Sequence, residues 1–132
     1  MQKRGAATAI VLAEDDPAIR TLFKRTLTGA GYDVLPAMDV EQAMDFLRAP
    51  GIAAAILDML FVNSGGLSGL DLLRYIRGEP SLVNLPVIVL TGFTLNHSVI
   101  AEVELLGAKL WQKPIRPLDL LQRLNGLVPH SL

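Results

Sequence analysis

Short apolar segments alternate with longer amphipathic segments along almost the whole chain, and this alternation limits the possible folds more than any other feature. In the longer segments, apolar residues recur at the spacing of one helix face. Five strands are predicted over residues 7–12, 32–35, 52–57, 86–90 and 109–112, and five helices over 17–28, 40–48, 69–77, 96–106 and 117–127. Such a (βα)5 pattern is typical of a doubly wound α/β sandwich, with a parallel sheet between two layers of helices.

The segment 52–57 contains only apolar side chains, as expected of a central parallel strand that is buried on both faces. It stops at Asp58, so this carboxylate is predicted to lie at the carboxyl end of a strand. In doubly wound folds, ligands bind outside the carboxyl ends of the strands. The polar residues that follow other predicted strands are Glu14, Asp15, Thr91 and Lys113. Together with Asp58 they form the candidate site.

Each of these residues has an ordinary structural explanation when it is taken alone. The three consecutive acidic residues 14–16 suit the start of a helix, and Asp16 before Pro17 is predicted to be a helix cap. An aspartate or a Thr-Gly pair after a strand is a common turn, and a lone lysine is usually exposed to solvent. The placement of all the candidate residues at carboxyl ends of strands favours a functional site over these separate explanations.

Three carboxylates that converge on one crevice repel one another unless a cation neutralises them. Because no histidine or cysteine lies near them in the sequence, their oxygens favour a hard divalent ion: Mg²⁺, with Mn²⁺ as a substitute. A carboxylate can act as a nucleophile in phosphoryl transfer and form an acyl phosphate when the transferred charge is neutralised. Asp58 is the candidate nucleophile, and Lys113 is the candidate cation.

Composition argues against several other classes of protein. A chain of 132 residues suits one domain, with a core over about residues 7–127, and no effector domain is visible. The net charge of -1 argues against direct nucleic-acid binding, and no apolar run approaches the roughly 20 residues that span a membrane. The absence of cysteine fits a cytoplasmic protein. His97 and His130 lack the spacing of metal ligands.

Several short motifs occur in an order that resembles the receiver domains of bacterial two-component response regulators, of the single-domain, CheY-like kind. The motifs are VLAEDDP at 11–17, ILD at 56–58, GLDLL at 69–73, VLTG at 89–92, LGA at 106–108 and QKP at 112–114. They extend over essentially the whole core of the chain. The resemblance implies a flavodoxin-like fold with strand order 2-1-3-4-5.

The resemblance also implies a signalling module, in which Asp58 accepts a phosphoryl group from a sensor histidine kinase or a histidine phosphotransfer protein. The domain then switches conformation. It would not be an enzyme beyond its own phosphorylation and slow dephosphorylation. By the same resemblance, Asp15 and Asp58 would ligate Mg²⁺ directly and Glu14 mostly through water. The backbone carbonyl of Leu60 would be a third protein ligand.

The residues expected to contact the phosphoryl group are also implied by the resemblance. Thr91 would donate a hydrogen bond to a phosphoryl oxygen, and Lys113 would pair with the phosphoryl group or with Asp58. A cis peptide bond is expected between Lys113 and Pro114.

Two departures from the family pattern stand out. The loop 59–68 is longer than usual and lacks the proline generally found early in it. The position three before the lysine, usually aromatic and associated with switching, is Leu110, while the neighbouring Trp111 occupies a normally aliphatic, inward-facing position. The usual aromatic switch therefore cannot be transferred to this chain.

The output is expected to leave through a noncovalent face formed by helix 96–106, strand 109–112 and helix 117–127. A downstream protein partner or a second copy of the chain could bind there. Two alternative functions remain open. One is a Mg²⁺-dependent aspartyl phosphohydrolase, although Met59 and Leu60 after Asp58 offer no second carboxylate for acid/base chemistry. The other is a pseudo-receiver, a scaffold that is never phosphorylated.

Overall fold

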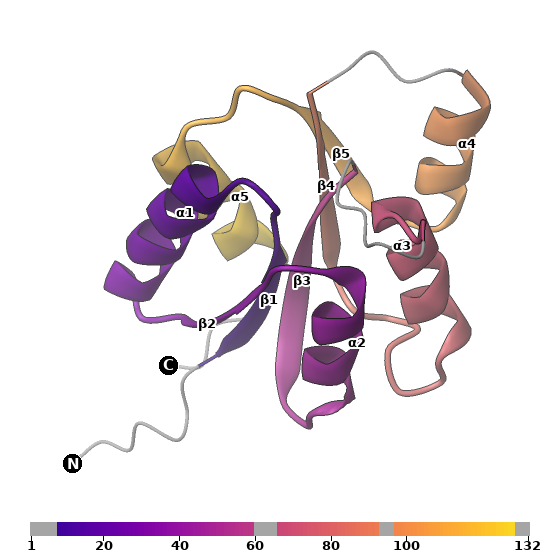
Figure 1. Ribbon diagram of the computed structural model, residues 1–132, viewed down its shortest axis with the longest axis horizontal. Helices are drawn as coiled ribbons and strands as arrows, with labels where there is room; N and C mark the ends of the chain where they lie inside the picture. Colours follow the sequence, from indigo (N-terminus) through magenta and orange to yellow (C-terminus); the bar gives the residue numbers. More distant parts are fainter. Residues whose placement is uncertain (1–7, 60–65, 93–96, 129–132) are drawn as a thin grey trace.

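The chain forms one five-stranded parallel sheet with helices on both faces (Figure 1). The computed structural model describes residues 8–59, 66–92 and 97–128. The strands are β1 (Ala9–Ala13), β2 (Asp33–Ala37), β3 (Ile52–Asp58), β4 (Val87–Thr91) and β5 (Lys109–Gln112). The helices are α1 (Pro17–Gly29), α2 (Val40–Arg48), α3 (Gly69–Gly78), α4 (His97–Leu105) and α5 (Pro117–Leu127). The strand order is β2-β1-β3-β4-β5, which confirms the predicted flavodoxin-like fold.

Two apolar layers hold the helices to the sheet. Helices α1 and α5 cover one face, and α2, α3 and α4 cover the other (Figure 1). The first layer includes Ile10, Leu12, Phe23, Leu27, Ile56, Leu90, Leu120 and Leu124. The second includes Val11, Val40, Leu47, Leu57, Leu72, Leu73, Ile76, Val89 and Val103. Alternate residues of the central strands enter opposite layers, so both faces of β3 and β4 are buried, as the wholly apolar segments 52–57 and 86–90 predict.

The helix boundaries follow local sequence signals closely. The Asp16 side chain accepts hydrogen bonds from the backbone of Ala18 and Ile19, and Pro17 opens α1, as predicted. The bounds of α2, β5 and α5 are the predicted ones. After the carboxyl end of α4, Gly107 has a φ of 73°, a left-handed conformation that glycine adopts without steric cost.

The largest difference from the predicted elements is in β2. This strand was expected over 32–35 but continues through Pro36 to Ala37. Proline cannot donate a hydrogen bond, so it is normally excluded from the middle of a sheet. Among the described strands, β2 lies at the edge of the sheet and pairs only with β1, so Pro36 is accommodated opposite Leu12 although it cannot donate a hydrogen bond. The first strand begins at Ala9; Ala7, its predicted start, lies outside the described residues.

Within the described residues, none of the helices has the length and apolar character needed to cross a membrane.

Candidate functional site

Three carboxylates meet where β1 and β3 end. Glu14 and Asp15 directly follow β1, Asp58 is the last residue of β3, and the two strands are neighbours with Ala13 opposite Leu57. One oxygen from each carboxylate lies within 4.8 Å of the others. Glu14 and Asp58 are only 1% and 4% exposed, whereas Asp15 faces solvent. Glu14, Asp15 and Asp58 therefore form an acidic cluster, in which Glu14 and Asp58 are buried and Asp15 is exposed.

Lys113 supplies a positive charge to the site. Its Nζ lies 3.1 Å from Oε1 of Glu14 and 3.2 Å from Oδ2 of Asp58. The residue follows β5, and its backbone N–H donates to the carbonyl of Thr91 at 2.7 Å, which ties it to the end of β4. The peptide bond to Pro114 is cis, as expected. One ammonium group thus bridges the carboxylates of two different strand ends.

The electrostatics of the site show an excess of negative charge. Burial, and then the neighbouring charge of Asp58, raise the pKa of Glu14 above its ordinary value despite the hydrogen bond from Lys113. Burial by itself would lower the pKa of Lys113, but its hydrogen bonds and charge interactions with Glu14 and Asp58 outweigh this and raise the pKa. Lys113 is therefore held protonated, and a single lysine does not neutralise three carboxylates.

The donor set fits a divalent metal ion. All three side chains of the acidic cluster offer oxygen ligands, which hard cations such as Mg²⁺ and Mn²⁺ prefer. An added positive charge there would relieve the repulsion that raises the pKa of Glu14. Glu14, Asp15 and Asp58 are the side chains that could hold the ion. Leu60, whose carbonyl was predicted as a further ligand, lies outside the described residues.

Thr91 completes the set of predicted site residues. It is the last residue of β4, is 4% exposed, and pairs with Gln112 of β5. On the other side of β4, the N–H of Met59 donates to the carbonyl of Leu90 at 2.8 Å. Thr91 therefore ends the strand that lies between Asp58 and Lys113. The structure brings the side chains predicted from the strand ends to one edge of the sheet.

Sequence reasoning missed two supporting contacts. The Arg20 guanidinium donates to the backbone carbonyl of Glu14 at 2.7 Å, which fixes the chain just before the exposed Asp15. Gly69, the first residue of α3, packs against the carbonyl of Asp58 so closely that a methyl group would overlap the carbonyl oxygen. A glycine at the start of a helix was the only available signal for this second contact, and it does not indicate which backbone the glycine approaches.

An apolar cavity of about 440 Å³ opens beside Lys113. It lies between the side chains of α1 and the segment that follows β5. Its lining consists of Ile19, Leu22, Phe23, Gly92, Lys113, Pro114 and Ile115. Leu22 is half exposed there. The charged site is thus bordered by an apolar surface.

Comparison with known proteins gives a consistent result. The model of the response regulator receiver domain matches residues 10–125. The transcriptional regulatory protein GltR of Pseudomonas aeruginosa is 32% identical over 126 residues, which are 93% of this chain and 50% of GltR. The response regulator MprA of Mycobacterium tuberculosis is 29% identical over 122 residues, 92% of this chain and 51% of MprA. The chain therefore spans about half the length of these curated relatives.

Solved structures show the same similarity in three dimensions. The chemotaxis protein CheY4 of Vibrio cholerae has a TM-score of 0.80 and 25% identity, covering 93% of this chain and 100% of that one. A putative response regulator from Chloroflexus aurantiacus has a TM-score of 0.78 and 26% identity, covering 92% and 97%. The predicted resemblance is confirmed by both sequence and fold.

Proposed function

This chain belongs to the response regulator receiver domain family, and we propose that it accepts a phosphoryl group on Asp58 in a Mg²⁺-dependent reaction and changes conformation as a result. The observation that carries the proposal is the position of Lys113. Its ammonium group lies within 3.2 Å of both Glu14 and Asp58, at the edge of the sheet where strand ends meet. A nucleophilic carboxylate and the cation needed to receive a phosphoryl group are therefore already side by side.

The chemistry assigned to Asp58 is a single displacement at phosphorus. One carboxylate oxygen would form an O–P bond as the N–P bond of a phosphohistidine breaks. The histidine nitrogen keeps the bonding electron pair and takes up a proton, and the product is an aspartyl phosphate. Lys113, held protonated by its carboxylate neighbours, would neutralise part of the transferred charge. Thr91, at the end of the adjoining strand, is the proposed hydrogen-bond donor to a phosphoryl oxygen.

Glu14, Asp15 and Asp58 would hold the Mg²⁺ ion, and Mn²⁺ has the same preference for oxygen ligands. The bound ion would supply positive charge to the phosphoryl oxygens and to the acidic cluster. Asp15 is the exposed member of this set, so an ion could reach its carboxylate from solvent. The backbone carbonyl of Leu60 remains a proposed ligand.

The proposed phosphodonor is a protein: a sensor histidine kinase or a histidine phosphotransfer protein, acting in the cytoplasm. The apolar cavity beside Lys113 supports this choice. A small anionic donor would gain nothing from Ile19, Leu22 and Ile115, whereas a protein could bury apolar side chains against them as its phosphohistidine approaches Asp58. The receiver domain family itself implies a histidine kinase partner.

The proposed output face comprises α4, β5 and α5. Each of its helices has an exposed leucine: Leu105 is 86% exposed on α4 and Leu118 is 66% exposed on α5. The guanidinium of Arg123, on α5, stacks on the half-buried ring of Trp111 in β5, 4.3 Å from its centroid. Such a surface could bind a downstream protein or a second copy of the chain. Trp111 also packs against the α1 and α5 layer, consistent with its predicted inward position.

The two rival functions differ from this proposal in their chemistry. A phosphohydrolase of this kind would have a second acid/base carboxylate shortly after Asp58 in the chain, but the next residue, Met59, is apolar and buried. A pseudo-receiver scaffold needs no nucleophile, yet Glu14, Asp58 and Lys113 are arranged in direct contact. Repeated turnover of small phosphomonoesters would favour the hydrolase.

Intact-mass measurement after incubation with acetyl phosphate and Mg²⁺ tests the proposal. One phosphoryl group is expected on the parent protein and none on Asp58→Asn. Removing Mg²⁺ with a chelator should prevent the modification. Asp45→Asn is the control, because Asp45 is an exposed carboxylate on α2 that forms an ion pair with Arg48 of the same helix. Phosphorylation of Asp58→Asn to the same extent as the parent would contradict the assignment.

A further inference from the structure

The start of α3 is built directly on the backbone of the proposed phosphoacceptor. At Gly69 a methyl group would overlap the carbonyl oxygen of Asp58 and lie 3.2 Å from both the Asp58 carbonyl carbon and the Met59 Cα. These are backbone atoms, which cannot rotate away as a flexible side chain can. The first turn of α3 and the end of β3 therefore cannot come closer together. A shift of the Asp58 backbone toward α3 must move the helix as well.

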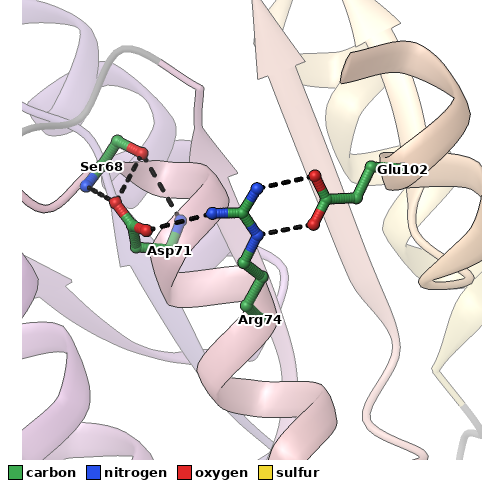
Figure 2. A network of polar contacts seen from close by, with 4 residues as sticks. All are labelled: Ser68, Asp71, Arg74 and Glu102. Carbon is green, nitrogen blue, oxygen red and sulfur yellow. Dashed lines mark hydrogen bonds and ion pairs between the residues drawn. The ribbon is translucent and has the colours of Figure 1, made fainter. Parts of the chain in front are cut away.

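A capping box makes this first turn rigid (Figure 2). The backbone N–H of Ser68 donates to Oδ2 of Asp71 at 2.8 Å, and the Ser68 hydroxyl caps the Asp71 backbone in return. Such reciprocal bonds satisfy the free N–H groups at a helix start. Oδ1 of Asp71 also accepts a hydrogen bond from Arg74 at 3.3 Å. The orientation of Arg74 is thus linked to the turn that contacts Asp58.

Arg74 extends from α3 to α4 (Figure 2). Its Nε and Nη2 donate to the two carboxylate oxygens of Glu102 at 2.5 and 2.7 Å. A planar guanidinium that binds both oxygens of a carboxylate fixes direction as well as distance. One helical turn further, Arg77 donates from Nε to the carbonyl of Leu106 at 2.5 Å and from Nη1 to that of Leu85 at 2.7 Å. Arg74 therefore contacts α4 itself, and Arg77 contacts the residue that directly follows the helix.

Apolar packing alone anchors α4 weakly. Among its described residues only Val103 is fully buried, and Leu105 points into solvent. A helix with one buried side chain has few contacts that resist a small displacement. The polar contacts from α3 consequently have more influence on the position of α4 than they would on a well-buried helix.

We propose that α3 transmits the state of Asp58 to α4, with Gly69 as the contact to the phosphoacceptor backbone and the Arg74–Glu102 pair as the contact to α4. This inference rests on the proposed phosphorylation of Asp58. It gives the chain a connection from the site to the output face that does not require an aromatic side chain at Leu110. Arg74 and Glu102 act as positioning residues, since neither belongs to the acidic cluster.

Hydrogen exchange of the α4 amides, with and without phosphorylation of Asp58, tests the connection. In the parent, phosphorylation should change these exchange rates by about fivefold or more, the lower end of typical coupling between sites. In Arg74→Gln, Glu102→Gln and the double variant, the ratio between the two states should fall below about twofold. Glu102→Gln leaves the Arg74–Asp71 hydrogen bond in place, so a similar ratio in all three variants would assign the effect to the Arg74–Glu102 pair. Arg48→Gln, which breaks an exposed ion pair on α2, is the matched control and should keep the parental ratio.

Intact mass measured on the same samples separates the two proposals. Normal phosphorylation with a parental exchange ratio in Arg74→Gln and Glu102→Gln would overturn the role of α3 and leave the proposed function standing. A parental ratio combined with faster exchange in both states would mean that the pair only stabilises α4, which also overturns the inference. Absence of phosphorylation in the parent would overturn both proposals.

Discussion

Helices α3 and α4 lie on the same face of the sheet but are attached to it in different ways (Figure 1). Helix α3 buries Gly69, Leu72, Leu73 and Ile76, whereas the described part of α4 buries Val103 alone. Helix α3, which is built on the backbone of Asp58, is therefore packed more tightly than α4, which packs through Val103 and is also joined to α3 by the Arg74–Glu102 ion pair. A switch needs both kinds of attachment, since one element must sense the site and another must be free to respond.

The largest expected effect on the free energy of unfolding comes from truncating a buried apolar side chain in each helix. Ile76→Ala in α3 should lower the free energy of unfolding by about 2–5 kcal/mol, because it leaves a cavity among fully buried side chains. Val103→Ala in α4 removes less apolar volume and should cost about 2 kcal/mol. Urea denaturation measures both. A greater loss for Val103→Ala than for Ile76→Ala would show that α4 is the better anchored helix and would break the comparison.

A second test compares the same glycine-to-alanine substitution at the two ends of α3. Gly69→Ala should destabilise the protein by about 1–3 kcal/mol, because the added methyl group forces the backbone of Asp58 to shift. The same shift should slow phosphorylation by acetyl phosphate. Gly78→Ala is the matched control at the far end of the helix, where an added Cβ meets no atom within 4 Å. It should be neutral or stabilising by about 0.4–1 kcal/mol.

Equal stabilities and phosphorylation rates for Gly69→Ala and the parent would mean that α3 can retreat from Asp58 without consequence. That result would remove the main physical basis for a role of α3 in sensing the site.

The smallest expected effect concerns pH and the capping box. The backbone hydrogen bond from Ser68 lowers the pKa of Asp71 below its ordinary value. Because the folded state favours the ionised form, this stabilisation is present above the ordinary pKa of about 4 and is lost as pH falls through the lowered pKa. Asp71→Asn should therefore cost up to about 1 kcal/mol at pH 7 and progressively less in acid.

Urea denaturation of parent and Asp71→Asn across this pH range provides the measurement. A stability difference that grows as the pH falls would show that the sign of the linkage is wrong. Asp45→Asn, at an exposed aspartate of α2, should stay within about 0.5 kcal/mol of the parent at pH 7.

Much of the fold and site follows from sequence because the governing signals are local. An apolar strand ending at Asp58 and a parallel sheet are enough to bring strand ends to one edge, where Glu14 and Lys113 also lie. The sequence does not show which of the three acidic residues 14–16 is buried. The structure buries Glu14 and exposes Asp15 and Asp16, a distinction decided by the direction in which the chain leaves β1.

The contacts between α3 and α4 could not be predicted for a different reason. Arg74 and Glu102 are 28 residues apart, and each lies on an exposed helix surface where periodicity says only that a polar residue is expected. Which charged side chains face each other depends on how two helices are placed on the sheet, which is a property of the packed core. The approach of Gly69 to Asp58 depends on the same placement.

The central claim is that Asp58 is the residue that becomes phosphorylated. Borohydride reduction after treatment with acetyl phosphate and Mg²⁺ converts an aspartyl phosphate to homoserine, which peptide mass spectrometry locates in the chain. The account predicts homoserine at position 58 in the parent and at no position in Asp58→Asn. Homoserine at Asp15 or another aspartate of the parent, with Asp58 intact, would contradict it.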